Sequence, residues 1–233
     1  MLTLVPDLPG ELPIDHATFQ RVQREVLTDE MLEIFSGYSW QRVSVAEGCF
    51  IADVGHDDKP KHQVALLYRS GAGVFAKAVS TRDESGVERI IDEWLVDTTI
   101  AGLDFLVRRA RLAAAAGSAS LRLSLYPVEE SRPVGLAHYR RHGLREGFGR
   151  LRTKRPVAQA VIDVDAVATS RRQLMMAVHA LASGIFHAFG VPEVYQIDAE
   201  GRVRRKYWSS DVQGMLKRWA EAGGVPIVES TVS

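Results

Sequence analysis

Two strands joined by a tight turn are predicted by the stretch Arg42-Val-Ser-Val-Ala-Glu-Gly-Cys-Phe-Ile-Ala-Asp-Val54. The turn is Glu47-Gly48, and the segments on both sides of it are rich in β-branched and aromatic residues. Residues 62–69 alternate like a third strand, and Ser70-Gly-Ala-Gly73 then signals a hairpin into a fourth strand over residues 73–80. Strands that follow one another through such short turns indicate an antiparallel meander.

Helices are expected before and after this meander in the sequence. Apolar residues recur at helical spacing over residues 15–36, with a break suggested near Thr28-Asp29. A long helical stretch is expected over residues 83–116, with a break suggested at residues 98–100. Residues 1–13 contain three prolines and are expected to form an extended arm.

The rest of the chain predicts a mixture of strands and helices. Strands are expected over residues 121–125 and 157–164, and a short helix over Pro133–Arg141. A helix over residues 171–189, a hairpin over 194–208 and a final helix capped by Asp211 follow. The fold class expected is therefore α+β, an antiparallel meander with long helices followed by a strand-helix-hairpin-helix part. The boundary falls near residue 155, giving segments 1–155 and 156–233, either as two domains or packed as one.

Composition places the chain among globular proteins. It has 233 residues, of which 46% are hydrophobic, and no apolar run approaches the ~20 residues that a membrane span needs. The first residues lack the basic and apolar regions of a secretory signal, and the single Cys49 excludes an internal disulfide. These features predict a cytoplasmic protein. Arginine outnumbers lysine 23 to 6, which is typical of a GC-rich bacterial genome.

The net charge of zero hides an uneven distribution along the chain. Residues 1–100 hold 9 basic and 17 acidic residues, residues 101–160 hold 12 and 4, and residues 161–233 hold 8 and 8. A basic segment of this kind is a reason to expect an anionic partner, either nucleic acid or an acidic protein surface. The alternative is that the acidic and basic segments neutralise each other.

The candidate binding residues lie in two basic clusters. The first cluster covers residues 139–155 and contains seven basic residues: Arg140, Arg141, Arg145, Arg150, Arg152, Lys154 and Arg155. Arginine makes bidentate bonds to phosphate, and Tyr139 or Phe148 could stack on a base. The second cluster covers residues 202–208, with Arg204 and Arg205 as its candidate contacts. A plain solvated basic face would show the same pattern.

Residues 102–145 resemble the back half of the GNAT acyltransferase fold. The resemblance rests on Gly102-Leu-Asp-Phe-Leu-Val-Arg-Arg-Ala-Arg-Leu-Ala-Ala-Ala-Ala-Gly117, on Leu121-Arg-Leu-Ser-Leu125 and on Ala137-His-Tyr-Arg-Arg-His-Gly-Leu144. It implies acetyl coenzyme A as cofactor and Tyr139 as general acid. The family's glycine-rich pyrophosphate loop matches Thr98-Thr-Ile-Ala-Gly-Leu-Asp104, which has one glycine only.

Residues 170–222 resemble the tail of bacterial proteins that carry a Schlafen-type AlbA-like domain. The residues concerned are Leu174-Met-Met-Ala-Val-His-Ala-Leu-Ala-Ser-Gly-Ile-Phe-His-Ala-Phe-Gly190, Glu193-Val-Tyr-Gln-Ile-Asp-Ala-Glu-Gly201 and Arg205-Lys-Tyr-Trp208. Those proteins are regulators thought to bind nucleic acid. The acidic motif of the AlbA-like domain is not found in this chain, so no site residue is transferred from it.

Three functions follow from these observations. The first is a non-catalytic binding or accessory module without cofactor, whose basic middle contacts an anionic partner. The second is an atypical or degenerate GNAT acyltransferase, and the third is a structural subunit of a larger protein complex. No metal site is expected, because His138 and His142 lack the intervening glutamate of a metalloprotease helix.

Overall fold

A computed structural model describes residues 1–29, 35, 39–54, 63–82, 86–126, 134–140, 143–144, 149–151 and 155–229, with the backbone alone for 139, 140, 143, 144 and 211. Helices and antiparallel strands are both present, which confirms the α+β class. Among these residues no helix is long and apolar enough to cross a membrane.

The chain divides into two compact units that are not consecutive in sequence. Unit 1 contains residues 1–78, 101–122 and 161–169, and unit 2 contains residues 79–100, 123–160 and 170–233. Neither unit coincides with the segments 1–155 and 156–233 that the sequence suggested.

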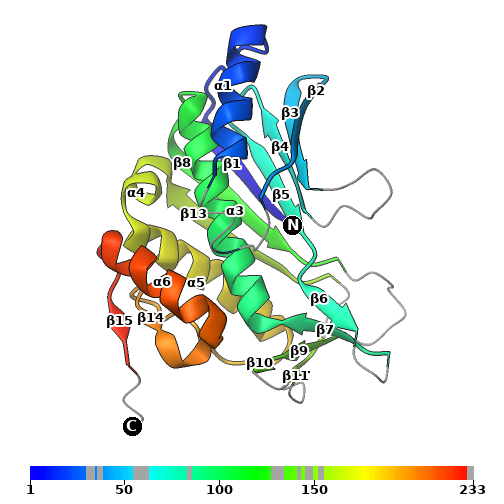
Figure 1. Ribbon diagram of the computed structural model, residues 1–233, viewed down its shortest axis with the longest axis vertical. Helices are drawn as coiled ribbons and strands as arrows, with labels where there is room; N and C mark the ends of the chain where they lie inside the picture. Colours follow the sequence, from blue (N-terminus) through cyan, green and yellow to red (C-terminus); the bar gives the residue numbers. More distant parts are fainter. Residues whose placement is uncertain are drawn as a thin grey trace. The chain divides into compact units, whose positions relative to one another are not determined.

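The predicted meander is confirmed in a seven-stranded sheet of order β13-β8-β1-β5-β4-β3-β2 (Figure 1). Its four meander strands are antiparallel: β2 (Arg42–Ala46), β3 (Cys49–Val54), β4 (Gln63–Tyr68) and β5 (Gly73–Lys77). Gly48 turns the first hairpin with φ +75°, a conformation that glycine adopts at little cost. The strands β8 (Ala116–Ser124) and β13 (Val157–Asp163) also belong to this sheet, and they overlap the strands expected over residues 121–125 and 157–164.

The extended arm expected over residues 1–13 is wrong for its first part, which forms strand β1 (Leu2–Leu8) inside the sheet. Leu2 and Leu4 alternate with exposed or half-buried residues, and they are 2% and 0% exposed. The prolines led to the wrong prediction, because proline is unfavourable within a ladder of strands. Pro6, however, lies beyond the ladder that β1 forms with β5, which runs from Leu2 to Leu4.

Helices α1 (His16–Leu27) and α3 (Asp92–Leu112) pack apolar residues in unit 1 against the meander (Figure 1). Phe105 of α3 lies 6.2 Å from Phe75 of β5, measured between ring centroids, and Trp40 contacts both rings. Gly102 permits this approach, because a Cβ there would meet the Phe75 ring at 2.7 Å. The glycine at the position of the GNAT loop is therefore a packing residue within a helix.

The boundaries of the first two helices were predicted in part. Helix α1 begins after the Asp15 cap and ends at Leu27, where the sequence suggested a break; beyond it residue 35 is helical, and residues 30–34 and 36–38 lie outside the described part. The helix expected over residues 83–116 begins at Asp92, because β6 (Ser80–Arg82) and β7 (Glu88–Ile91) form strands. It continues unbroken through residues 98–100, so the suggested break is wrong.

Unit 2 contains a four-stranded sheet of order β12-β9-β7-β6, with β9 (Val134–Ala137) parallel to β7 and β12 at residues Gly149–Arg150. The helix expected over Pro133–Arg141 is wrong, because β9 and β10 (Tyr139–Arg140) occupy most of its described residues, and β10 pairs with β11 (Gly143–Leu144) just beyond it. All four residues of β9 are buried. A short apolar run of this kind does not distinguish helix from strand by its periodicity.

The C-terminal elements largely follow the predictions. Helix α5 (Arg171–Ala188) is capped by the Ser170 side chain, and a short helix α4 (Val164–Thr169) precedes it. The predicted hairpin is reduced to one bridge, Ile197 to Val203, followed by a turn of 3-10 helix η1 (Arg205–Tyr207). Strand β14 (Val203–Arg204) pairs in parallel with β15 (Ile227–Val228). Helix α6 (Ser210–Ala222) has Ser209, rather than the predicted Asp211, as its N-cap.

Candidate functional site

The candidate binding residues whose positions are described all lie in unit 2. Arg150 in β12 and Arg155 before β13 are exposed, while Arg140 is described by its backbone in β10. Arg204 forms an ion pair with Glu193 at 3.2 Å, and Arg205 forms one with Glu229 at 2.7 Å. Four predicted residues, Arg141, Arg145, Arg152 and Lys154, lie outside the described residues, as does Phe148.

Tyr139, the general acid that the GNAT resemblance implies, lies in β10 and is described by its backbone. The acyltransferase alternative therefore stays a prediction, and so does acetyl coenzyme A as its cofactor. Helix α3 is unbroken where the family would have its pyrophosphate loop, at residues 98–104.

A side-chain cluster that the sequence analysis missed begins at the ends of two parallel strands. Asp92 directly follows β7, and His138 directly follows β9, where the ladder pairs Ile91 with Ala137. The His138 Nδ1 atom lies 2.5 Å from the Asp92 Oδ2 atom. The carboxyl ends of parallel strands are where ligands bind in many α/β proteins, so this position favours a functional role.

Asp92 is buried, and its carboxylate holds several partners. Its side chain is 1% exposed, its Oδ1 accepts the Glu93 backbone N–H at 2.8 Å, and its Oδ2 accepts the Gln196 amide at 2.7 Å. Asp92 also opens α3, where the helix dipole stabilises a negative charge. The Gln196 Oε1 atom is buried without a hydrogen-bond partner among the described residues. Burying polar groups in this way is costly, which is typical of positions that serve a function.

Three half-buried aromatic rings lie beside this carboxylate. The His138 ring is 5.3 Å from the Tyr195 ring, and the Tyr195 ring is 5.4 Å from the Tyr207 ring, measured between centroids. The Lys206 ammonium lies 4.6 Å from the centroid of the Tyr207 ring. Burial of the phenol, with the charge of Glu193, the neighbouring Tyr207 and the charge of Asp92, raises the pKa of Tyr195 above its ordinary value. The Tyr195 phenol is therefore neutral at physiological pH.

The signal that could have revealed this cluster is weak in the sequence. Ile90-Ile91-Asp92 and Leu136-Ala137-His138 are both apolar runs that end on a polar residue. Both runs fall within helices that the sequence predicted, so the shared edge of two strands was not expected. Tyr195 and Tyr207 lie far from both runs in sequence, and only the fold brings them there.

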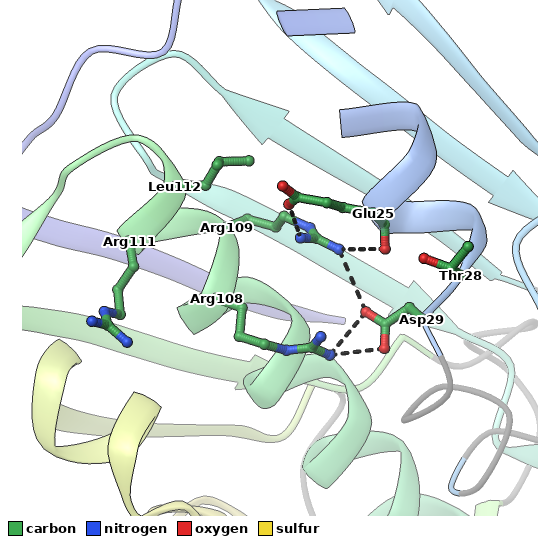
Figure 2. Close-up of a pocket in the computed structure, with 7 residues that line it drawn as sticks. All are labelled: Glu25, Thr28, Asp29, Arg108, Arg109, Arg111 and Leu112. Carbon is green, nitrogen blue, oxygen red and sulfur yellow. Dashed lines mark hydrogen bonds and ion pairs between the residues drawn. The ribbon is translucent and has the colours of Figure 1, made fainter. Parts of the chain in front are cut away.

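A second cluster lines a depression of about 720 Å³ in unit 1 (Figure 2). Arg108 donates to both carboxylate oxygens of Asp29 at 2.8 Å, while Arg109 donates to the Glu25 carboxylate at 2.9 Å and lies 3.5 Å from Asp29. Asp104 lies 2.6 Å from Arg108. Figure 2 shows both guanidinium groups directed toward Asp29, so the arginines here are paired with carboxylates of their own unit.

Each arginine of this second cluster is paired with a carboxylate. Burial and the neighbouring Arg108 charge lower the pKa of Arg109 below its ordinary value, although Asp29 and Glu25 act in the opposite direction. Arg111, the third arginine on the rim, pairs with Asp165 of α4 at 3.2 Å. The ion pairs of the cluster therefore join the α1 region to α3 and stabilise unit 1.

No metal-binding group of three or more His, Cys, Asp or Glu side chains occurs among the described residues. Cys49 is buried in β3, and burial raises the pKa of its thiol, as expected for a packing residue.

Comparisons with known proteins give no relative. No family model, no curated protein and no solved structure matches this chain.

Proposed function

We propose that the chain is a non-catalytic binding module whose unit 2 holds an anionic partner, nucleic acid, on its two basic clusters. The observation that carries this proposal is the pair of ring contacts made by Tyr195. Its ring contacts His138, which directly precedes the first basic cluster, and Tyr207, which belongs to the second. The residue that precedes the first cluster and a residue of the second, about seventy residues apart in sequence, therefore lie beside one tyrosine of unit 2.

The distribution of charge supports the same conclusion. Residues 139–155 hold seven basic residues and one acidic residue, Glu146. In unit 1, Arg108, Arg109 and Arg111 are matched by carboxylates of that unit. The positive excess of residues 101–160 thus resides in the segment that includes the first basic cluster.

The ion pairs of the second cluster are compatible with binding. Glu193 and Glu229, which pair with Arg204 and Arg205, have side chains that are 52% and 74% exposed. Exposed pairs contribute about 0–1 kcal/mol, so a phosphate can replace either carboxylate at little cost. Each guanidinium could then form a bidentate contact with a phosphate.

Direct binding measurements test this proposal. Labelled single- and double-stranded DNA and RNA are titrated with the full chain at ~50 and ~200 mM salt. Over this range, affinity that depends on several phosphate contacts falls measurably. We expect binding at the lower salt that weakens at the higher salt and decreases in an Arg150→Ala/Arg155→Ala variant.

The matched control is a Lys217→Ala/Arg218→Ala variant. It also removes two positive charges from exposed positions in unit 2, but from helix α6. Equal loss in both variants would indicate a nonspecific effect of charge and would contradict the proposed site. Absence of binding at ~50 mM salt would favour an acidic protein partner or a structural role in a complex.

A further inference from the structure

We infer that His138, Tyr195 and Tyr207 form a stacking surface for the bases of a single-stranded nucleic acid. This inference rests on the proposed function and names its ligand more closely. The three rings are half-buried and contact one another in turn, at centroid distances of 5.3 and 5.4 Å and interplanar angles of 52° and 34°, and we call this tilted series of rings the row. Bases stack on such aromatic rows with little dependence on sequence, because every base has a π-face.

The rings are held in place by a buried hydrogen-bond network. The Asp92 carboxylate lies beside the His138 ring and also accepts the Gln196 amide. The backbone carbonyl of Gln196 accepts the Trp208 indole N–H at 3.0 Å. Asp92, Gln196 and Trp208 are 1%, 0% and 3% exposed.

Each ring belongs to a residue that contacts or directly adjoins a member of this network. His138 contacts Asp92 directly, Tyr195 precedes Gln196 in the chain, and Tyr207 precedes Trp208. A rigid support of this kind reduces the entropy lost when a ligand binds. An aromatic cluster that served packing alone would not need a buried carboxylate and amide beneath it, at the cost of burying polar groups.

The charges around the row fit a strand of phosphates. The Lys206 ammonium lies beside the Tyr207 ring, Arg204 and Arg205 precede it, and the first basic cluster begins after His138. Stacked bases with phosphates on basic side chains are the usual arrangement in single-strand binding. A duplex offers its phosphates but not the faces of its bases, because these are stacked on one another.

An abasic ligand tests the inference without altering the protein. The full chain is titrated with an oligothymidylate of about 15 nucleotides and with an abasic phosphodiester strand of the same length and charge. We expect the base-bearing strand to bind at least about fivefold more tightly, both as DNA and as the corresponding oligouridylate. Equal affinity for the two strands would overturn the inference, while leaving salt-sensitive binding by the arginines as support for the proposed function. No binding of either strand at ~50 mM salt would overturn the inference, and no binding of duplex DNA or RNA under the same conditions would overturn the proposed function as well.

Variants of the rings give a second, independent readout. Tyr195→Leu and Tyr207→Leu should each weaken the base-bearing strand at least about fivefold and leave the abasic strand unchanged, whereas Tyr195→Phe should bind as the parent does. Tyr126→Leu is the control, because Tyr126 is an exposed tyrosine of unit 2 outside the row, 54% exposed. Parent affinity in both leucine variants would also overturn the inference.

Discussion

His138 and Asp92 stand at matching positions of two neighbouring parallel strands, each one residue beyond the pair Ile91 and Ala137. The His138 Nδ1 atom lies 2.5 Å from the Asp92 Oδ2 atom, and the carboxylate is almost completely buried. The strand ladder therefore fixes the distance between the two side chains. The exposed part of the imidazole is positioned by a group that solvent does not reach.

Replacing Asp92 by alanine should destabilise unit 2 strongly. Gln196 and His138 would lose a buried acceptor, and Gln196 already has its Oε1 atom without a partner among the described residues. We expect the free energy of unfolding, measured by urea titration, to fall by about 3 kcal/mol. The control is Asp165→Ala, which removes an exposed ion pair with Arg111 and should cost less than about 1 kcal/mol. Equal effects of the two substitutions would contradict a structural role for the buried carboxylate.

Removal of the Asp29 carboxylate should destabilise unit 1, because this carboxylate compensates the charges of two arginines. Its side chain is 1% exposed and faces Arg108 and Arg109, and Arg109 is itself 7% exposed. Asp29→Ala leaves a buried guanidinium with less compensation, so we expect a loss of about 3 kcal/mol in urea unfolding. Glu11→Ala removes an exposed pair with Arg69 and should change stability by less than about 1 kcal/mol.

A double variant measures the interaction energy between Asp29 and Arg109. In Asp29→Ala/Arg109→Leu both charges are gone, and a hydrophobic side chain fills the space of the guanidinium. The double variant should recover part of the stability lost in Asp29→Ala, because an unpaired buried charge is the main cost. Additive losses would show that the two residues do not interact energetically.

The sequence predicted the elements whose signals are local. The hairpin around Glu47-Gly48, the helix that begins after Asp15 and the helix capped by Ser170 are confirmed, because turn, cap and periodicity lie within a few residues. Strand β9 was wrongly expected to be a helix, because its apolar residues become a strand only through pairing with β7, more than forty residues earlier. Strand β1 was missed for a similar reason, since its pairing partner β5 lies about seventy residues later.

The candidate site also contains residues with a local signal and residues that only the fold brings together. Its basic residues were found from composition, which needs no fold. The ring row was not, because His138, Tyr195 and Tyr207 are brought together by the parallel ladder and by the turn that leads into Trp208. The network of Asp92, Gln196 and Trp208 joins three segments of the chain, and no spacing in the sequence indicates it.

Asp198 should make the stability of unit 2 depend on acid pH. Burial would raise the pKa of its carboxyl, but hydrogen bonds from the Arg202 backbone and guanidinium outweigh burial and hold the pKa below the ordinary value. A carboxyl with a lowered pKa in the folded state stabilises the fold above the unfolded pKa of about 4, and the contribution disappears as pH falls through the folded pKa. We therefore expect Arg202→Ala to destabilise the protein at pH ~6 and to have a smaller effect well below pH ~4.

Urea unfolding of the parent and of Arg202→Ala at several pH values measures this difference. Arg172→Ala serves as the control, because the Arg172 guanidinium donates to the backbone carbonyl oxygen of Glu200, a group that does not titrate. A difference between parent and Arg202→Ala that is the same at every pH would rule out linkage through Asp198.

Two glycines in the helices of unit 2 should respond differently to substitution by alanine. Gly184 of α5 lies against β13, where an added Cβ would meet the Ala158 Cβ at 2.6 Å, whereas a Cβ at Gly214 of α6 would meet nothing within 4 Å. Alanine favours a helix over glycine by about 1 kcal/mol, so Gly214→Ala should raise the free energy of unfolding by up to that amount. At Gly184 the same gain is opposed by overpacking, which costs about 1–3 kcal/mol, so Gly184→Ala should be neutral to destabilising. Thermal or urea unfolding of both variants tests the contact, and a stabilisation of equal size at the two positions would show that α5 does not approach Ala158 this closely.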